Sequence, residues 1–588
     1  MVPCIPPNAP FDAQQRAWLN GWLAGLFADA GVMGAQPPTE PAVALKPLLI
    51  LYGSQSGSAE GIANGLGGEA KGKGFTPRVM ELNGFAKLDL TKEANLVIVT
   101  STWGDGDPPD NAGEFWDFIR ADDAPKLENL NYAVLALGDS SYSDFCAAGR
   151  NMDERLAALG AKRFHDRVDC DVEFEEPAAA WTLGMWEKLS AVAGAATVTA
   201  GEVAPVAAEE EVTGFNRKNP FPARLLTNRL LNKPGSAKDT RHFEISLEGS
   251  GLAYETGDAL GVVPQNCPDL VNDIVKALGV SAGAVVPLPD GGEADLRTAL
   301  REAYAITAPT PALLKAVAKK AGDGVLSALL APDKKAELEK WLWGREVIDL
   351  LLSHPGVRFG AAEFVGLLRK LQPRLYSISS SPKAHPGEVH LTVAAVRYES
   401  LGRARKGVCS TFLADRVDLN ATPVPVFVQT AHGFRVPADG DTPMIMVGPG
   451  TGIAPFRAFL EERKATGAKG GNWLFFGDQH QESDFMYRDE LEAYQTEGLL
   501  TRLDLAFSRD QAEKIYVQNR MDENAAELWR WLEDGAHFYV CGDAKRMAKD
   551  VDEALHRVIA SAGGRSAEDA AEYVKKLKAG KRYQRDVY

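Results

Sequence analysis

Three loops of this chain combine hydroxyl groups, glycines and small residues directly after an apolar, strand-like run. They are GSQSGSAEG at 53–61, STWGDGDPPDNAG at 101–113 and LGDSSYSDFC at 137–146. Backbone N–H groups at the start of a helix bind phosphate well. The second and third loops also carry Trp103 and Tyr142, whose rings can stack on a flat heterocycle. Ser and Gly turns are also ordinary helix caps, so it is the three loops together that predict a nucleotide-type ligand.

A second group of motifs lies later in the chain. RLYS at 374–377 offers an Arg for a pyrophosphate, a Tyr for a ring face and a Ser beside it. TVA at 392–394, Tyr398 and GVCSTFL at 407–413 follow, and the last of these suits a phosphate loop that opens a helix. RxYS alone is weak evidence, and the trio predicts a second ligand of the same type.

The segment MIMVGPGTGIAPFRAF at 444–459 reads as strand, glycine loop and helix, in which glycines let the backbone approach a pyrophosphate. AFSRDQAEKIYVQ at 506–518 then gathers hydrogen-bond donors and positive charge. This favours a 2′-phosphate and so NADP over NAD, although a solvated turn is the simpler alternative. The donors are Ser508, Arg509, Lys514, Tyr516 and Gln518.

Two further features stand near the end of the chain. In HFYVCGDAKRMAKDV (537–551), Cys541 ends a strand-like run, and such a Cys is more often an inert small hydrophobe. The chain then ends in KRYQRDVY, with Asp586 between Tyr583 and Tyr588. Most domains end in a polar tail, yet a terminal Tyr can simply pack on its own domain, so the residues alone leave its role open.

Composition restricts the class of protein. The net charge of −16 argues against a protein that binds a nucleic-acid backbone. The six cysteines form no CxxC pair, so they offer no spacing for zinc or an iron–sulfur cluster and suit a reducing compartment. The N-terminus has no signal-type pattern and no uncharged run could span a bilayer. We therefore expect a cytoplasmic protein without a bound metal.

The elements that must position these motifs form several domains, because 588 residues exceed what one core can organise. Apolar strands alternate with amphipathic helices near both ends of the chain, which is typical of doubly wound parallel sheets. An Ala-, Val- and Glu-rich stretch resembles a linker, and a β-type middle part is interrupted by a helical insert. The expected boundaries are 1–45 for an N-terminal helix and linker, 46–190, 191–217 for a flexible linker, 218–438 with an insert at about 267–370, and 439–588.

The N-terminal stretch at 8–31 predicts a single short helix with a wide apolar stripe. It could pack on its own domain, bind a partner or self-associate.

These motifs resemble known flavoproteins. Residues 46–190 look like the flavodoxin fold, and TWGDGDPPDNA resembles the FMN domain of the diflavin reductases. The trio from RLYS onward resembles the FAD-binding barrel of the ferredoxin–NADP reductase family, and GPGTGIAPF its NADP domain. NWLFFG, SRDQ, AELWRW, DGAHFYVCGDA and YQRDVY are similar to the flavoprotein (alpha) subunits of assimilatory NADPH–sulfite reductases.

The resemblance implies three binding sets. The FMN set is Ser54, Gln55, Ser56, Gly57, Ser58, Ala59, Ser101, Thr102, Trp103, Gly104, Leu137, Gly138, Asp139, Ser140, Ser141, Tyr142, Ser143, Asp144, Phe145 and Cys146. The FAD set is Thr307, Arg374, Leu375, Tyr376, Ser377, Thr392, Val393, Ala394, Tyr398, Gly407, Val408, Cys409, Ser410 and Tyr588. The NADP set is Gly450, Thr451, Ser508, Arg509, Lys514, Ile515, Tyr516, Val517, Gln518, Cys541 and Asp550, with Asp543 nearby.

The resemblance also implies a function. NADPH gives a hydride to FAD, with Ser377, Cys541 and Asp586 tuning the site and Tyr588 covering the FAD face, and FMN passes electrons to an acceptor protein. The implied acceptor is a separate sirohaem and iron–sulfur haemoprotein, the beta subunit, which reduces sulfite to sulfide for cysteine biosynthesis. Acidic residues at Asp105, Asp107, Asp110 and 169–176 could dock a basic patch on it, although acidic surface is more often plain solvation.

Two alternatives stay open. One is a soluble diflavin reductase that serves a haem monooxygenase or another acceptor. The other is a flavin-binding assembly module in which electron transfer is vestigial; such a module should stay oxidised when NADPH is added.

Overall fold

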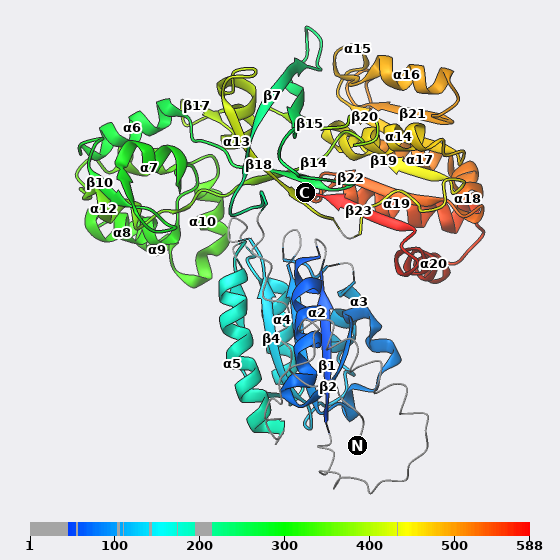
Figure 1. Cartoon of the computed structure of the whole chain (residues 1–588), viewed down its shortest axis with the longest axis horizontal. Helices are drawn as coiled ribbons and strands as arrows, with labels where there is room; N and C mark the ends of the chain where they lie inside the picture. The colour runs from blue at the N-terminus through cyan, green and yellow to red at the C-terminus, as the bar shows by residue number, and fades with distance from the viewer. Residues whose placement is uncertain are drawn as a thin grey trace, which may run out of the picture.

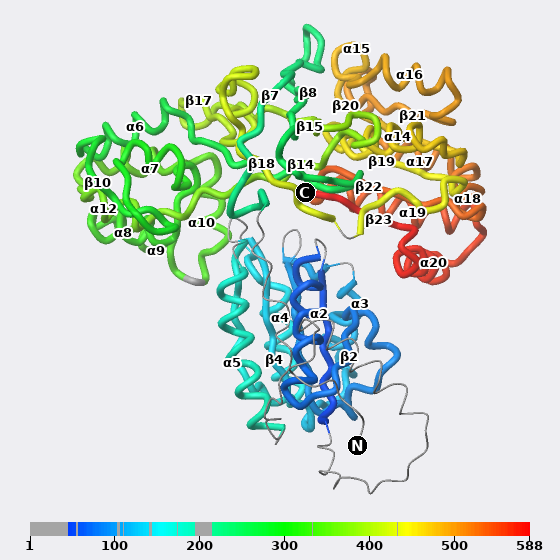
Figure 2. Tube along the Cα trace, in the orientation of Figure 1, coloured from blue at the N-terminus to red at the C-terminus, as the bar shows by residue number. Residues whose placement is uncertain are grey.

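The computed structural model describes residues 45–54, 57–102, 106–109, 111–139, 144–172, 174–193, 214–431 and 433–588. The helix expected at 8–31 and most of the expected linker lie outside these residues. Figure 1 shows three bodies: an N-terminal sheet domain, a β-rich middle part with a helical lobe, and a C-terminal sheet domain. Figure 2 shows that the C-terminus lies at the centre, where the three meet.

The N-terminal sheet is parallel, with strand order β2–β1–β3–β4–β5 and β6 also paired with β4. The strands β1, β3 and β4 are apolar and mostly buried because helices cover both faces of the sheet: α2 and α5 pack on one face, α3 and α4 on the other. The carboxyl ends of β1, β3 and β4 meet at one edge, the usual ligand crevice of this strand order. The strands are β1 (Lys46–Gly53), β2 (Phe75–Glu81), β3 (Asn95–Ser101), β4 (Asn131–Leu137), β5 (Lys162–Arg163) and β6 (Val168–Cys170), and the helices are α2 (Ser58–Ala70), α3 (Gly113–Arg120), α4 (Ala147–Ala158) and α5 (Glu175–Ala193).

The middle part is an antiparallel barrel with strand order β14–β9–β18–β7–β8–β15. A bridge between Ile378 and Leu391 brings its two edges together. The hairpin β16–β17 and the short helix α13 follow the barrel strand β15. The elements are β7 (Phe221–Leu230), β8 (Thr240–Ser246), β9 (Ala259–Val262), β14 (Arg374–Ser377), β15 (Glu388–Ala394), β16 (Arg397–Ser400), β17 (Arg403–Lys406), α13 (Val408–Thr411) and β18 (Pro423–Gln429).

The helical lobe has a hydrophobic core of its own. The buried side chain of Arg405, on the hairpin β16–β17, connects the lobe to the middle part. Arg405 of β17 donates to Glu346 at 3.0 Å and to Asp349 at 2.7 Å, both at the start of α11. The lobe contains α6 (Pro268–Leu278), β10 (Val285–Pro287), β11 (Glu293–Asp295), α7 (Leu296–Glu302), β12 (Tyr304–Ala305), α8 (Pro311–Ala321), α9 (Gly324–Leu329), α10 (Lys335–Leu342), α11 (Val347–Ser353), α12 (Ala361–Val365) and β13 (Arg369–Lys370).

The C-terminal sheet is parallel, with strand order β21–β20–β19–β22–β23. Its strands are β19 (Met444–Val447), β20 (Asn472–Asp478), β21 (Arg502–Phe507), β22 (His537–Gly542) and β23 (Tyr583–Val587). Its helices are α14 (Ala454–Thr466), α15 (Gln481–Asp484), α16 (Arg488–Thr496), α17 (Val517–Glu523), α18 (Ala525–Glu533), α19 (Met547–Ala562) and α20 (Ala567–Ala579). Across the described chain, no helix is both long and apolar enough to span a membrane.

Among the described residues, two ion pairs join the N-terminal domain to the rest. Lys335 of α10 lies 2.7 Å from Asp144, and Lys575 of α20 lies 2.9 Å from Glu114. They therefore connect this domain to both the helical lobe and the C-terminal domain.

Candidate functional site

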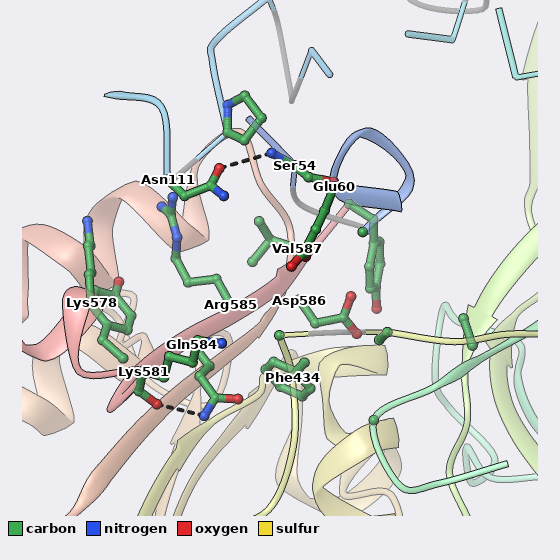
Figure 3. Close-up of a pocket in the computed structure, with 18 of the residues that line it drawn as sticks. Ser54, Glu60, Asn111, Phe434, Lys578, Lys581, Gln584, Arg585, Asp586 and Val587 are labelled. Atoms are coloured by element: carbon green, nitrogen blue, oxygen red, sulfur yellow. Dashed lines mark hydrogen bonds between the residues drawn. The ribbon is translucent and has the colours of Figure 1, made fainter. Parts of the chain in front are cut away.

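One cavity of about 1270 Å³ lies where the three bodies meet. Figure 3 shows Ser54 and Glu60 of the N-terminal domain facing Arg585, Asp586 and Val587 of β23. Of the predicted binding residues, this cavity brings together Ser54, Gly57, Asp139, Arg374, Leu375, Tyr376, Ser377, Thr392, Val393, Ala394, Thr451, Asp586 and Tyr588.

Three polar side chains meet at one side of this cavity: Ser377 and Asp586 line it, and the buried Cys541 lies behind them. The Ser377 hydroxyl donates to Asp586 Oδ2 at 2.5 Å, and the Cys541 thiol donates to the same oxygen at 3.7 Å. Burial raises the pKa of the Asp586 carboxyl above its usual range, and these two hydrogen bonds partly offset that rise. Burial and the adjacent carboxyl also hold the pKa of the Cys541 thiol well above its usual value, so the thiol remains protonated.

Strand pairing explains why these residues meet. β23 runs parallel to β22, and its register sets Asp586 beside Cys541. Ser377 ends β14, an edge strand of the barrel path. The trio therefore spans the boundary between the barrel and the C-terminal sheet.

Tyr588 has a fixed backbone and an accessible ring. Its N–H donates to Gly542 O at 3.0 Å and its carbonyl accepts from Ala544 N at 3.1 Å. The side chain is 58% exposed, and its hydroxyl lies 2.8 Å from Thr451 Oγ1. The ring can thus move while the two backbone hydrogen bonds that hold Tyr588 stay in place.

The glycine loop after β19 packs directly on β22. A side chain at Gly452 would meet the Cys541 carbonyl at 2.1 Å, so only Gly allows this approach. Gly450 has φ 58° and open space around its missing side chain. The loop therefore leaves room for a ligand beside Thr451.

The loop after β1 fits a phosphate group. Gly57, with φ 86°, starts α2, and within the described residues no side chain caps that helix. Ser54 N donates to Asn111 Oδ1 at 2.9 Å, and Ser54 Oγ is buried with no hydrogen-bond partner in the described part of the chain. Uncapped N–H groups and an orphaned hydroxyl at one helix start are the donors that a phosphate needs.

The loop before α13 fits a second phosphate. Gly407 precedes α13, and a side chain there would meet Ser410 Oγ at 2.6 Å. Ser410 Oγ accepts from Val396 N at 3.1 Å, and Tyr398 of β16 is 50% exposed nearby in sequence. Burial raises the pKa of the Cys409 thiol to about 12, so it behaves as a packed apolar group.

The predicted 2′-phosphate donors lie after β21. Arg509, Lys514 and Tyr516 are exposed, whereas Ser508 Oγ donates to the Asp478 carbonyl at 3.2 Å. Gln518 Nε2 donates to Asp550 Oδ2 at 3.0 Å, which joins two predicted residues far apart in sequence.

The remaining predicted binding residues either do not line the cavity or lie outside the described residues. Within the described chain, the lining of the cavity does not include Ser58, Ala59, Ser101, Thr102, Leu137, Gly138, Asp144, Phe145, Cys146, Thr307, Tyr398, Gly407, Val408, Cys409, Ser410, Gly450, Ser508, Arg509, Lys514, Ile515, Tyr516, Val517, Gln518, Cys541 or Asp550. Gln55, Ser56, Trp103, Gly104, Ser140, Ser141, Tyr142 and Ser143 lie outside the described residues.

Sequence reasoning did not assign several residues that line the cavity. Asn111 fixes the first phosphate loop, and its position inside the 101–113 motif was an available signal. Gln429, at the end of β18, and Thr430 and Ala431 directly after it line the cavity, and no motif marks them. Arg585 also lines it; burial lowers its pKa while Asp107 opposes that shift.

Comparisons with known proteins agree with this architecture. The chain matches the Flavodoxin family over residues 50–181, the FAD binding domain family over 213–412 and the Oxidoreductase NAD-binding domain family over 446–553. It is 45% identical to the "Sulfite reductase [NADPH] flavoprotein alpha-component" of Bacillus subtilis (strain 168), over 99% of both chains. It is 44% identical to the protein of that name from Vibrio vulnificus (98% of this chain, 94% of the relative) and 43% identical to that of Mannheimia succiniciproducens (99% of both).

The family matches run through all three bodies and include the strands that carry Ser377 and Cys541. The chain belongs to the family of sulfite reductase [NADPH] flavoprotein alpha-components.

Proposed function

We propose that the chain is an NADPH-dependent diflavin reductase that passes electrons from NADPH through FAD and FMN to a separate haemoprotein that reduces sulfite. The observation that carries the proposal is the continuity of the cavity. It is lined by the first phosphate loop at Ser54 and Gly57, by β14 at Arg374–Ser377, and by Thr451 and the C-terminal strand. Two ring ligands and a nicotinamide could therefore occupy one connected space.

The residues present suit these ligands. Ser54 and the start of α2 would hold the FMN phosphate, and Arg374 with the Gly407 loop would hold the FAD pyrophosphate. Exposed Arg509 and Lys514 would hold the 2′-phosphate of NADPH. Flavins, when bound, accept electrons in pairs and release them singly, which is the chemistry that this sequence of carriers needs.

The chain's own residues prepare the place where nicotinamide must stack. Tyr588 covers it, and the Tyr ring must move aside while its backbone stays in the sheet. Ser377 and Cys541 hold the Asp586 carboxylate in one orientation by donating to the same oxygen. A fixed carboxylate there stabilises the positive charge that develops on a nicotinamide ring as it gives up a hydride.

The test is anaerobic NADPH oxidation by the flavin-loaded chain mixed with a sirohaem sulfite reductase haemoprotein, with and without sulfite. Cytochrome c reduction serves as the control for working flavins. We expect oxidation that depends on both haemoprotein and sulfite. If cytochrome c is reduced while sulfite changes nothing, the acceptor is wrong and another haem protein takes its place; if neither is reduced, electron transfer itself is absent.

We also propose that the segment at 8–31 mediates assembly and that the protein works in the cytoplasm. The apolar stripe of that segment and the unpaired cysteines among the described residues support these two points. Deletion of residues 1–40 should lower the mass measured in solution, and an unchanged mass would contradict the assembly role.

A further inference from the structure

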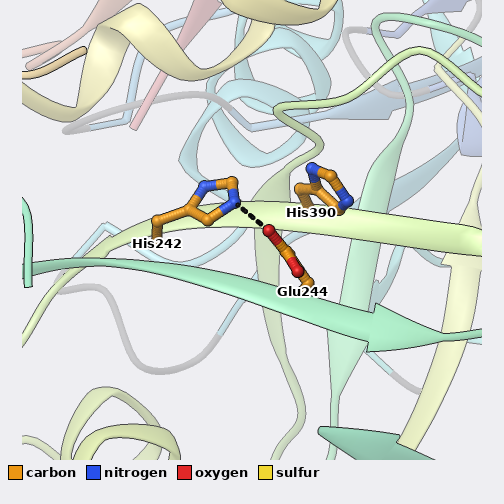
Figure 4. Close-up of side chains that lie close together, drawn as sticks. All are labelled: His242, Glu244 and His390. Carbon is orange, nitrogen blue, oxygen red and sulfur yellow. Dashed lines mark hydrogen bonds and ion pairs between the residues drawn. The ribbon is translucent and has the colours of Figure 1, made fainter. Parts of the chain in front are cut away.

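A cluster of imidazoles and carboxylates lies on the edge of the barrel, on strands β8 and β15. The two strands are antiparallel, with Glu244 opposite His390 and His242 opposite Thr392. Side chains at alternate positions share a face, so His242, Glu244 and His390 stand on one side of the sheet. Figure 4 shows the three side chains converging from the two strands.

We propose that His242, Glu244 and His390 form a binding site for a divalent transition-metal ion such as Zn²⁺. One ligand atom of each residue lies within 4.8 Å of the others. Two imidazoles and a carboxylate are a ligand set that such ions use, with remaining positions left to water.

The spacing is close to what an ion needs. Metal–ligand distances of 2.0–2.2 Å put the ligands of a tetrahedral ion about 3.3 Å apart. Glu244 Oε1 and His242 Nε2 are already 3.2 Å apart. The Glu244 side chain is 31% exposed, which gives an ion a path from solvent, and its other oxygen accepts from Thr227 Oγ1 at 2.6 Å.

Both imidazoles are buried in the barrel, so the strands fix their positions. His242 is 1% exposed and His390 is 2% exposed. The nearby Arg457 is already paired, because it lies 2.9 Å from Glu461 and 2.7 Å from Glu490. The charge of Arg457 therefore does not exclude a cation from the cluster.

The second nitrogen of each ring is oriented by another group, as it is in metal sites generally. His242 Nδ1 lies 2.9 Å from the Tyr487 hydroxyl, which lies 2.6 Å from Thr392 Oγ1. His390 Nε2 lies 3.2 Å from Glu388 Oε2. His390 Nδ1 is buried and has no hydrogen-bond partner in the described part of the chain, which is the independent sign of a missing ligand.

A second triad, His385, Glu388 and His390, overlaps the first. His385 Nε2 already bonds Glu461 at 3.1 Å and His385 follows β14 in a loop rather than a strand. The pair of strands β8 and β15 holds the first triad more rigidly, so we assign the ion to it.

The experiment is equilibrium dialysis of the chelator-treated, untagged, flavin-loaded chain against micromolar ZnCl₂, with zinc and flavin counted by elemental analysis and absorbance. The variants are Glu244→Gln, His390→Gln and His385→Gln. The matched control is His354→Gln, at a His–acid pair elsewhere, where His354 lies 3.2 Å from Asp323.

We expect one more zinc ion per chain in the wild type than in Glu244→Gln or His390→Gln, because these two variants should bind zinc more than tenfold more weakly. The variants His385→Gln and His354→Gln should bind as many ions as the wild type. The proposal is overturned if the wild type binds no zinc, if Glu244→Gln binds like the wild type, or if His385→Gln loses the ion while Glu244→Gln keeps it. Glu244 is partly exposed, so its Gln variant keeps the test valid even if His390→Gln fails to fold.

Discussion

Asp586 and Cys541 are register partners in the parallel pair β22–β23, and the Cys541 thiol donates to the Asp586 carboxylate over 3.7 Å. The carboxylate is therefore placed by a strand at the edge of a sheet rather than by a mobile tail. Val587, the next residue, is buried and anchors the strand. The last residues of the chain thus form one wall of the cavity where nicotinamide is expected.

Replacing Asp586 with Asn should slow flavin reduction by NADPH about tenfold or more, because the charge that faces the nicotinamide site is lost. The measurement is the absorbance decrease of the flavin after rapid anaerobic mixing with NADPH. Asp534→Asn is the control, because Asp534 is an exposed acid before the amino end of β22 and does not line the cavity. Equal rates in Asp586→Asn and the control would show that the carboxylate has only a packing role.

The Ser377→Ala variant should move the acid limb of the pH–rate profile to higher pH. Burial raises the pKa of Asp586 and the Ser377 hydrogen bond lowers it, so removal of that bond lets the pKa rise further. Because the ionised carboxylate is the active form, the rate falls as pH drops through this pKa. An acid limb that stays in place, with only a uniform loss of rate, would contradict the coupling of Ser377 to Asp586.

Tyr588→Ala should tighten the binding of NADP⁺ several-fold and slow its release, because the ring that competes with nicotinamide is gone. The inhibition constant of NADP⁺ and the steady-state rate measure these two effects. Tyr588→Phe keeps the ring and loses only the hydrogen bond with Thr451, so it should resemble the wild type. If Tyr588→Ala lowers the melting temperature and leaves NADP⁺ binding unchanged, the Tyr merely packs on its domain.

The sequence predicted the N-terminal sheet well because its central strands β1, β3 and β4 are nearly continuous apolar runs, which are typical of parallel strands buried on both faces. The position of Cys541 at the end of a strand was also readable. The pairing of Asp586 with Cys541 was not, because register between distant strands depends on tertiary packing. Thr392 illustrates the same limit: it is the first residue of the predicted FAD motif TVA, yet its hydroxyl bonds Tyr487 of the C-terminal domain.

The ion pairs Lys335–Asp144 and Lys575–Glu114 should control how long the N-terminal domain stays against the other two. Their partly exposed side chains make them weak and salt-sensitive. The double variant Lys335→Glu and Lys575→Glu should open the molecule, increase its radius of gyration in solution scattering and, when internal transfer is not limiting, raise cytochrome c reduction. High salt should produce the same change in the wild type. Lys576→Glu is the matched control, because Lys576 pairs with Glu572 of its own helix at 3.9 Å and with no other acid in the described part of the chain. If the double variant and Lys576→Glu scatter alike, these pairs do not hold the domain in place.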